Sequence, residues 1–485
     1  MNDKKDNPVL LTDLYELTMM QGYYLCHKNV PVVFDMFFRR TPFNGGYAVF
    51  AGLEPLVNSI LNFRFTDDHL GYLDTLGLFK PEFLKYLSKF RFTGDLYSVE
   101  EGELVFPNEP LVRVHSGIIE AQLLESILLN ITNYQTLVAT KTARIREAAK
   151  GRRIIEFGLR RAQGPDGAMS ASRAAFIGGA EATSNVMAAK TFNIPPKGTM
   201  AHSWVMSFES ESDAFENFAR LYPENTILLV DTYSTLKSGI PAAIKVFRKL
   251  KHRGIKNFGI RLDSGDLEYI SKQARAMLDS ANLREAKIVV SNELDEYTIE
   301  QLINKKSPID SFGVGTNLVT AKGDSALTGV YKLVARKPGK RFVPCIKVSD
   351  NPGKTTNPGV KNVLRIYGRD KFMLADLIFL EKEKTAITGK SRAKSTMALF
   401  HPDYTYKSVR VSGYGRTRAL LRNVVRGGKI NYEFPSLPGI QSKTLSNLKT
   451  LHPTYKRLLN PHVYKVSITK NLQNMKFSMI NKWKA

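Results

Sequence analysis

His202 lies in the segment GTMAHSWVMSF (residues 198–208), between a Gly-Thr pair and a Ser-Trp pair. Histidine changes its charge near neutral pH more readily than other side chains, and its neutral imidazole is a good nucleophile toward phosphorus. The same apolar and hydroxyl neighbours also suit a core histidine with one satisfied hydrogen bond. The segment alone therefore predicts either a phosphoryl acceptor or a structural histidine.

Two glycines in DSFGVGTNLVT (residues 310–320) indicate a phosphate site. Gly313 and Gly315 come at the end of an apolar run, and a helix-like pattern begins at Thr316. Glycines at such a place let backbone N–H groups face a phosphate, and the dipole of the following helix assists. A bare Gly-X-Gly is equally typical of a tight turn, so its position in the fold decides between the two.

The motif GIRLDSGDL (residues 259–267) combines charge with a small turn. Arg261 stands inside an apolar run that Asp263, Ser264 and Asp266 follow. A carboxylate at such a turn can accept hydrogen bonds from the two hydroxyls of a ribose. An arginine can stack on an aromatic ring or bind an anion with two N–H groups. We therefore expect a sugar and an anion here.

A second charged motif, FGLRRAQGPDGA (residues 157–168), has Arg160 and Arg161 directly after an apolar run. Cationic side chains at the mouth of a barrel cost desolvation unless an anion binds there. With the preceding motifs, these arginines predict a site for a ribose, a phosphate and a further anion.

The elements that must position these residues follow from the apolar runs in the middle of the chain. Runs begin near residues 227, 257 and 287, and helical patterns lie between them. Strands that alternate with helices at this spacing predict βαβ units. We expect an α/β fold with an irregular parallel α/β barrel over residues 120–345. The runs are 154–157, 227–230, 258–262, 287–290 and 309–315.

Polar residues end three of these runs: Asp231-Thr232, Asp263-Ser264 and Ser291-Asn292. In an α/β barrel the site lies at the carboxyl ends of the strands, so these residues should converge. Each of them could instead be a helix N-cap, which is the commonest role of Asp or Ser at that place.

Segments with β-type alternation flank the expected barrel. Residues 96–116 and 341–368 each contain turn signals between apolar alternations. We expect a β-rich lobe built from residues 1–119 and 346–400. Residues 401–485 should form a basic α+β appendage.

Composition narrows the class of protein. The 485 residues are 43% hydrophobic and 24% charged, and only two cysteines occur, which predicts a cytoplasmic protein without disulfides. No apolar run has the length of a signal peptide or a membrane span. The net charge of +25 is as consistent with binding of an anionic small molecule as with binding of a nucleic acid, and the sequence contains no nucleic-acid-binding motif.

Six motifs in this order resemble nicotinate phosphoribosyltransferases. They are LTDLYELTMMQGYY (11–24), FGLRRAQGPDG, GTMAHS, RLDSGDL, FGVGTNLVT and IKVSDNPGKTTNPG (346–359). Each motif is weak alone, but the ordered set covers residues 9–370 and is specific. The resemblance implies NAD salvage: the ring nitrogen of nicotinate attacks the anomeric carbon of phosphoribosyl pyrophosphate, and pyrophosphate leaves.

The resemblance assigns roles to individual residues. His202, Arg160 and Asp263 would be catalytic, with Asp263 next to an oxocarbenium-like ribose. The pyrophosphate would bind Mg²⁺ and the cationic side chains of Arg39, Arg40, Arg160 and Lys347. The phosphoribosyl group would bind Asp263, Ser264, Gly313, Gly315 and Thr316.

The same resemblance implies a nicotinate subsite. Tyr15 and Phe157 would enclose the pyridine ring, and Tyr15 would come from the partner subunit of a homodimer with shared sites. Ser184 takes the place of an aspartate that recognises an amide in the nicotinamide enzymes, which favours a carboxylate ligand. Thr199 and Arg261 complete the predicted subsite.

His202 matches the histidine that ATP phosphorylates in this family, so we expect a phosphohistidine that couples ATP hydrolysis to affinity and product release. Three alternatives remain. A nicotinamide enzyme would be the nearest, whereas a quinolinate enzyme is usually shorter and lacks the AHS motif. A basic nucleic-acid-binding protein with a degenerate barrel is the alternative from another class, although we expect neither a nucleic-acid nor a membrane partner.

Overall fold

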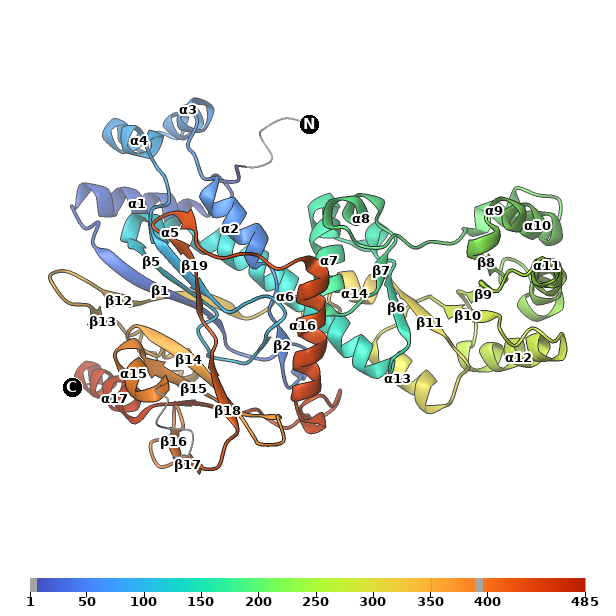
Figure 1. The fold of residues 1–485 in the computed structure, drawn as a ribbon. Coiled ribbons are helices and arrows are strands. Elements are labelled where there is room, and N and C mark those ends of the chain that lie inside the picture. Colours follow the sequence, from blue (N-terminus) through green and yellow to red (C-terminus); the bar gives the residue numbers. More distant parts are fainter. Residues whose placement is uncertain (1–6, 350, 389–395, 485) are drawn as a thin grey trace. The chain divides into compact units, whose positions relative to one another are not determined.

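A computed structural model describes residues 7–349, 351–388 and 396–484 (Figure 1). The chain forms two compact units. Unit 1 comprises residues 1–137 and 326–485, and unit 2 comprises residues 138–325. The helix α6 (Glu125–Ala148) begins in unit 1 and ends in unit 2. The domain limits expected from the sequence stay a prediction.

Unit 2 contains a six-stranded sheet in which every pairing is parallel, in the order β7-β6-β11-β10-β9-β8. The sheet curls into a half-barrel, which confirms the predicted fold class. Its strands are β6 (Arg153–Glu156), β7 (Ala182–Thr183), β8 (Thr226–Leu229), β9 (Phe258–Leu262), β10 (Lys287–Val290) and β11 (Ser311–Val314).

Helices follow the strands of unit 2, as the βαβ pattern predicts (Figure 1). Ile240, Phe247 and Leu250 are buried on α11, and Ala274 is buried on α12. The helices are α7 (Gly164–Gly178), α8 (Val186–Phe192), α9 (His202–Met206), α10 (Glu211–Leu221), α11 (Ile240–His252), α12 (Leu267–Ser280), α13 (Glu296–Asn304) and α14 (Thr316–Val319).

Unit 1 is rich in β-structure, with sheets of seven and six strands and a two-stranded pair, β2 (Ala48–Val49) with β4 (Leu104–Val105). The seven-stranded sheet has the order β13-β12-β1-β5-β3-β19-β20. Its strands are β1 (Pro31–Phe38), β3 (Asp95–Ser98), β5 (Val112–Gly117), β12 (Gly329–Arg336), β13 (Val343–Pro344), β19 (Arg422–Arg426) and β20 (Lys429–Ile430).

The six-stranded sheet of unit 1 has the order β17-β16-β21-β15-β14-β18. Leu364, Ile366, Leu377, Phe379 and Leu399 form its apolar core. Its strands are β14 (Lys361–Tyr367), β15 (Met373–Leu380), β16 (Met397–Phe400), β17 (Ser408–Val411), β18 (Arg416–Ala419) and β21 (Val466–Ile468). The described helices of unit 1 besides α6 are α1 (Leu14–Leu25), α2 (Leu53–Leu61), α3 (Asp67–Thr75), α4 (Pro81–Ser88), α5 (Ile118–Leu123), α15 (Lys384–Thr388), α16 (Leu437–Thr450) and α17 (Lys470–Lys484).

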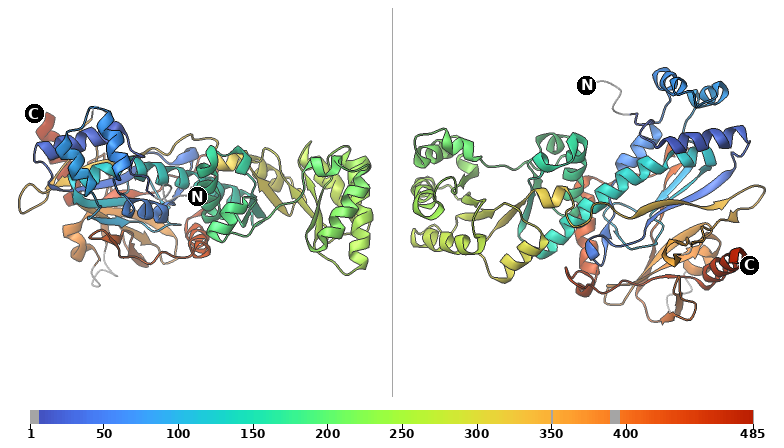
Figure 2. Two further views of the ribbon diagram at one scale, coloured as in Figure 1. Left: turned by 90° about the horizontal axis from the view of Figure 1, so that it is seen from above. Right: turned by 180° about the vertical axis from the view of Figure 1, so that it is seen from behind.

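The first and last parts of the chain interleave in unit 1, as the blue and the orange-to-red segments show in Figure 2. The strand β1 pairs with β5 on one side and with β12 on the other, and β19 pairs with β3. The β-rich lobe therefore takes strands from before and after the parallel sheet. The C-terminal segment contributes to the same sheet through β19.

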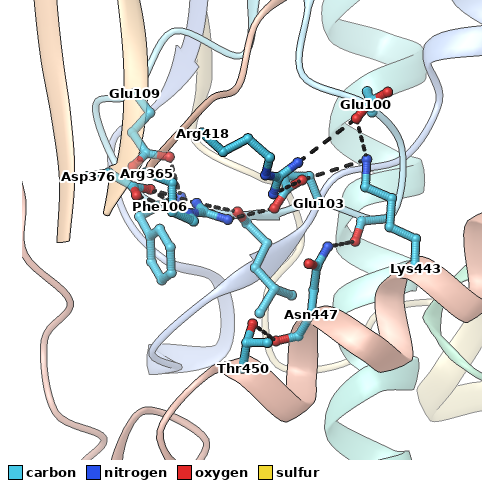
Figure 3. A network of polar contacts seen from close by, with 12 residues as sticks. Glu100, Glu103, Phe106, Glu109, Arg365, Asp376, Arg418, Lys443, Asn447 and Thr450 are labelled. Carbon is cyan, nitrogen blue, oxygen red and sulfur yellow. Dashed lines mark hydrogen bonds and ion pairs between the residues drawn. The ribbon is translucent and has the colours of Figure 1, made fainter. Parts of the chain in front are cut away.

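A buried ionic network joins these distant segments (Figure 3). Arg365 on β14 binds Asp376 on β15 with Nη2 at 2.6 Å and Glu103 with Nη1 at 2.6 Å. Arg418 and Lys443 contact Glu103 and Glu100 from the C-terminal part of the chain. Arg365, Glu103 and Asp376 are removed from water, so each of these three charges needs its partners if the chain is to stay folded.

Candidate functional site

Polar residues gather at the carboxyl ends of the parallel strands of unit 2. Asp231 follows β8, Asp263 follows β9, Ser291 follows β10 and Thr316 follows β11. Parallel pairing brings the carboxyl ends of neighbouring strands to one edge of the sheet. This edge is the part of unit 2 that could hold a substrate.

The centre of the site is a cluster around Arg261. Its Nη2 lies 2.9 Å from Oδ1 of Asp263, and its Nε donates to Oγ of Ser291 at 2.8 Å. The Ser291 hydroxyl also donates to Asp263. Arg261 donates with Nη1 to the Thr199 hydroxyl at 3.2 Å, and its guanidinium carbon lies 5.5 Å from the centre of the Phe157 ring. The structure thus brings Phe157, Thr199, Arg261 and Asp263 together.

Asp231 organises the turn after β9. The sequence predicts it among the polar residues at the carboxyl ends of the strands but gives it no specific role in binding or catalysis. Its Oδ2 accepts hydrogen bonds from the Asp263 backbone N–H at 2.9 Å and the Ser264 hydroxyl at 2.6 Å. Within the described part of the chain, its Oδ1 is buried and accepts no hydrogen bond. The position of Asp231 directly after an apolar run indicates either a site residue or a helix N-cap, and the sequence does not distinguish the two.

His202 is the first residue of the short helix α9 and is half-buried. Its Nδ1 lies 3.1 Å from the hydroxyl oxygen of Thr232, which directly follows Asp231. The tautomer in which Nδ1 donates to Thr232 leaves the lone pair on Nε2. The contact places His202 next to the residues that follow β8.

The loop after β6 is held against the end of β11. The backbone N–H of Phe157 donates to the carbonyl of Val314 at 2.8 Å. A Cβ added at Gly313 would lie 2.4 Å from the Phe157 ring, and one added at Gly158 would lie 2.1 Å from the Val319 side chain. These close approaches explain both glycines sterically.

The predicted phosphate residues lie at neighbouring turns of this edge. Gly315 precedes α14, and Thr316 at the start of that helix has its hydroxyl 3.3 Å from Oε1 of Glu293. The close approach of the Phe157 ring is sufficient to explain why residue 313 is a glycine. Phosphate binding by Gly313, Gly315, Thr316 and Ser264 stays a prediction.

The remaining predicted residues of unit 2 lie at the ends of β6 and β7. Arg160 and Arg161 are exposed in the 3₁₀ turn Leu159–Arg161 (η3). Ser184 directly follows β7, is half-buried and donates its backbone N–H to the carbonyl of Glu156 at 2.9 Å.

Four predicted site residues belong to unit 1. Tyr15 lies on α1 and is 47% exposed, and partial burial with nearby Glu125, Glu16 and Asp13 raises the pKa of its phenol. Arg39 and Arg40 directly follow β1, and their backbone N–H groups donate to the Thr328 hydroxyl at 3.2 and 3.0 Å.

The fourth of these residues, Lys347, is exposed, and its backbone N–H donates to the Thr356 hydroxyl at 3.1 Å. A common site of Tyr15, Arg39, Arg40 and Lys347 with the residues of unit 2 stays a prediction.

Two negative findings apply to residues 7–349, 351–388 and 396–484. No three or more His, Cys, Asp or Glu side chains there gather as a metal site. No helix in those ranges has both the length and the apolar character that crossing a membrane requires.

A parallel half-barrel with its polar residues at the carboxyl edge defines an enzyme of the α/β-barrel class. The nicotinate phosphoribosyltransferase of Bacillus subtilis (strain 168) is 44% identical to this chain over 486 residues, which cover 99% of this chain and 97% of the relative. The chain belongs to the nicotinate phosphoribosyltransferase family.

Family models agree with this relative along the chain. The N-terminal domain of nicotinate phosphoribosyltransferase (NAPRTase) matches residues 10–133, the family model matches residues 152–383, and the C-terminal domain matches residues 360–476. A nicotinate phosphoribosyltransferase from Dictyostelium discoideum is 37% identical and covers 96% of this chain and 86% of the relative.

Solved structures show the same fold. The crystal structure of human nicotinic acid phosphoribosyltransferase has a TM-score of 0.83 at 30% identity and covers 98% of this chain and all of its own. A nicotinate-nucleotide pyrophosphorylase from Pyrococcus furiosus has a TM-score of 0.72 at 22% identity, covering 93% of this chain and 97% of its own. The second likeness concerns the fold alone.

Proposed function

We propose that this chain transfers the phosphoribosyl group from phosphoribosyl pyrophosphate to nicotinate in NAD salvage. A bond forms between the ring nitrogen and the anomeric carbon, and the bond from that carbon to the pyrophosphate oxygen breaks with its electron pair leaving on pyrophosphate. The ring nitrogen is already nucleophilic, so the reaction needs no general base. It needs charge stabilisation.

The observation that carries the proposal is the cluster of Arg261, Asp263 and Ser291 beside Phe157. Asp263 would stabilise the positive ribose while Asp231 holds its backbone. The anionic groups of the substrate would bind at two places. Arg160, Arg39, Arg40 and Lys347 would bind the pyrophosphate, and Ser264, Gly313, Gly315 and Thr316 would bind the 5′-phosphate.

The nicotinate ring would lie on Phe157, with Tyr15 on its other face. Its carboxylate would accept hydrogen bonds from Ser184, Thr199 and Arg261. A hydroxyl at residue 184 does not repel a carboxylate, whereas an aspartate would, which supports nicotinate over nicotinamide. Because Tyr15 lies far from this site in sequence, we propose that it comes from the second subunit of a homodimer with shared sites. We also propose that the protein is cytoplasmic.

His202 would accept a phosphoryl group from ATP. Nε2 would form a bond to the γ-phosphorus, the bond from that phosphorus to the bridging oxygen would break, and ADP would leave. The contact between Nδ1 and the Thr232 hydroxyl supports this role, since the tautomer in which Nδ1 donates would orient the ring and leave Nε2 as the nucleophile. The added charge would then change the affinity for the substrates.

Mg²⁺ is the metal that this chemistry requires. It is commonly held by one or two carboxylates together with substrate phosphates, so a dedicated protein cage is not needed. The buried and unpartnered Oδ1 of Asp231 beside Asp263 fits such a ligand among the described residues. Mg²⁺ there would neutralise the charge of the departing pyrophosphate.

One assay tests the proposed function. The purified protein is incubated with phosphoribosyl pyrophosphate, Mg²⁺ and either nicotinate or nicotinamide, with and without ATP, and the mononucleotide is measured. We expect nicotinate mononucleotide with ATP stimulation and little product from nicotinamide. Preferential use of nicotinamide would show that nicotinamide, and not nicotinate, is the substrate. Salt-dependent binding to random DNA without either turnover would favour the nucleic-acid alternative.

A further inference from the structure

Glu156 is the last residue of β6. Its carboxylate is buried and takes no part in the proposed reaction. The residue is only 1% exposed, although a buried carboxylate is costly unless hydrogen-bond donors surround it. Three donors reach it: the backbone N–H of Gly158 and the hydroxyls of Ser172 and Thr183. They come from the loop after β6, from α7 and from β7.

One carboxylate oxygen holds the loop that carries Phe157. Oε1 accepts the N–H of Gly158, while the N–H of Phe157 itself donates to Val314. The Phe157 ring fills the space beside Gly313. Two backbone hydrogen bonds therefore hold the segment Phe157–Gly158, and packing beside Gly313 restricts the ring.

The other carboxylate oxygen holds the end of β7. Oε2 accepts the Thr183 hydroxyl at 2.5 Å and the Ser172 hydroxyl at 2.9 Å. The Thr183 hydroxyl in turn accepts the backbone N–H of Asn185 at 3.0 Å, and the N–H of Ser184 donates to the carbonyl of Glu156. Ser184 thus bonds Glu156 through its own backbone and lies between Thr183, which bonds the carboxylate, and Asn185, which bonds the Thr183 hydroxyl.

We propose that Glu156, acting through Thr183, is a positioning residue that sets the place of the Ser184 hydroxyl relative to the Phe157 ring. This inference rests on the proposed function, in which Phe157 stacks on the ring and Ser184 receives its carboxylate. A displacement of either residue would weaken the binding of nicotinate more than the binding of phosphoribosyl pyrophosphate. Glu156 itself touches neither substrate.

The test compares Thr183→Val, which removes the hydroxyl at nearly constant shape, with Thr183→Ser, which keeps it. Ser271→Ala is the matched control, because Ser271 is a fully buried hydroxyl on α12 that bonds the carbonyl of Glu268. For each protein we measure kcat, both KM values, the ratio of nicotinate to nicotinamide use, nicotinate binding by calorimetry, and Tm.

Thr183→Val should raise the KM and the calorimetric Kd for nicotinate roughly tenfold, as the loss of one buried hydrogen bond implies. The KM for phosphoribosyl pyrophosphate should stay within about twofold, and the preference for nicotinate should fall. Thr183→Ser should restore most of the nicotinate affinity, and Ser271→Ala should match the wild type in all kinetic values.

Three outcomes would overturn the inference. Nicotinate affinity in Thr183→Val could equal that of the wild type, both KM values could rise together, or Thr183→Ser could be as impaired as Thr183→Val. If Thr183→Val does not fold, Ser172→Ala takes its place with the same expected KM split. Nicotinate turnover by the wild type tests the proposed function separately. Its absence would overturn the proposed function and, with it, the positioning role of Glu156.

Discussion

Arg261 on β9 and Asp263 directly after that strand carry opposite charges, and each restrains the other. Arg261 uses Nη2 and Nε for Asp263 and Ser291, so its guanidinium plane has a defined direction beside Phe157. A lysine could not make these two bonds from one planar group. Preorganised groups of this kind contribute to catalysis because they need no reorientation during the reaction.

Arg160 is exposed after β6, which leaves its charge available for an anion. Arg160→Ala should lower kcat by a factor of about 10²–10³, which corresponds to the roughly 3 kcal/mol that one lost preorganised donor costs. Steady-state kinetics with nicotinate and phosphoribosyl pyrophosphate measure the effect. Turnover close to the wild-type value would contradict the role of Arg160 at the leaving group.

His202→Ala should abolish phosphorylation of the chain by ATP and Mg²⁺ and should leave some ATP-independent transfer. The reason is that the ring nitrogen attacks the ribose without help from this histidine. We expect one acid-labile, base-stable phosphoryl group per wild-type chain and none in the variant. The measured quantity is the ratio of activity with ATP to activity without it.

A purely structural His202 makes a different prediction for the same variant. Loss of its hydrogen bond to Thr232 would then lower stability by about 1–3 kcal/mol, and the ratio of activities with and without ATP would persist. Survival of that ratio in His202→Ala would contradict the phosphohistidine.

At the scale of elements, a few charged side chains hold strands together that lie far apart in sequence. Arg365 on β14 binds Asp376 on β15 and Glu103 near β4 (Figure 3). The Tyr464 hydroxyl, close to β21, donates to Asp376 at 3.1 Å. Removing one member of such a buried set leaves its partners uncompensated, which typically costs 3–5 kcal/mol.

Glu109 belongs to the same network, and burial together with the neighbouring Asp376 raises its pKa well above 4.5, while Arg365 and the Phe106 backbone oppose the shift. Between the pKa of the unfolded form and that of the native form, the native carboxyl therefore keeps its proton while the unfolded carboxyl is ionised. Above pH 4.5 this group lowers the free energy of unfolding by up to about 1.4 kcal/mol per pH unit, until the native pKa is reached.

Glu109→Gln should remove this pH dependence, since an amide resembles the protonated carboxyl. We expect the urea midpoint of the variant to exceed that of the wild type, by a margin that widens from pH 5 to pH 8. Glu82→Gln, at an exposed position on α4, is the control. A margin that is constant with pH would contradict a raised pKa at Glu109.

At the scale of the whole molecule, the predicted site residues are divided between the two units. His202, Asp263 and the nicotinate residues Phe157 and Ser184 belong to unit 2, whereas Tyr15 belongs to unit 1. Tyr15 lies on α1 and is 47% exposed. This exposure is compatible with a role toward a second copy of the chain.

Subunit sharing predicts complementation between two inactive variants. A hybrid dimer of Tyr15→Ala and Asp263→Ala chains would contain one site with both wild-type residues. Equal mixing should therefore restore about a quarter of the wild-type activity, because half of the dimers are hybrid. Subunit exchange is verified with two affinity tags, and no recovery after exchange would show that each chain contains a complete site.

The sequence by itself determined five of the six strands of the parallel sheet in unit 2, and it did not predict β7. The predicted strands at 154–157, 227–230, 258–262 and 287–290 correspond to β6, β8, β9 and β10 within a residue at each end. Such strands can be predicted from the sequence because a continuous run of apolar residues, bounded by polar ones, is typical of a strand that is buried on both faces. The motifs that carry the family resemblance are likewise local, so their order survives in the linear sequence.

Only the tertiary structure decided which of the polar residues share hydrogen bonds. Asp231 contacts Asp263 across 32 positions, and Glu156 contacts Thr183 across 27. The pairing of β1 with β12 and the contacts of Arg365 with Glu103 span still longer stretches. Sequence patterns report the burial of each residue along its own element, whereas these contacts depend on strand order and register, which are properties of the whole fold.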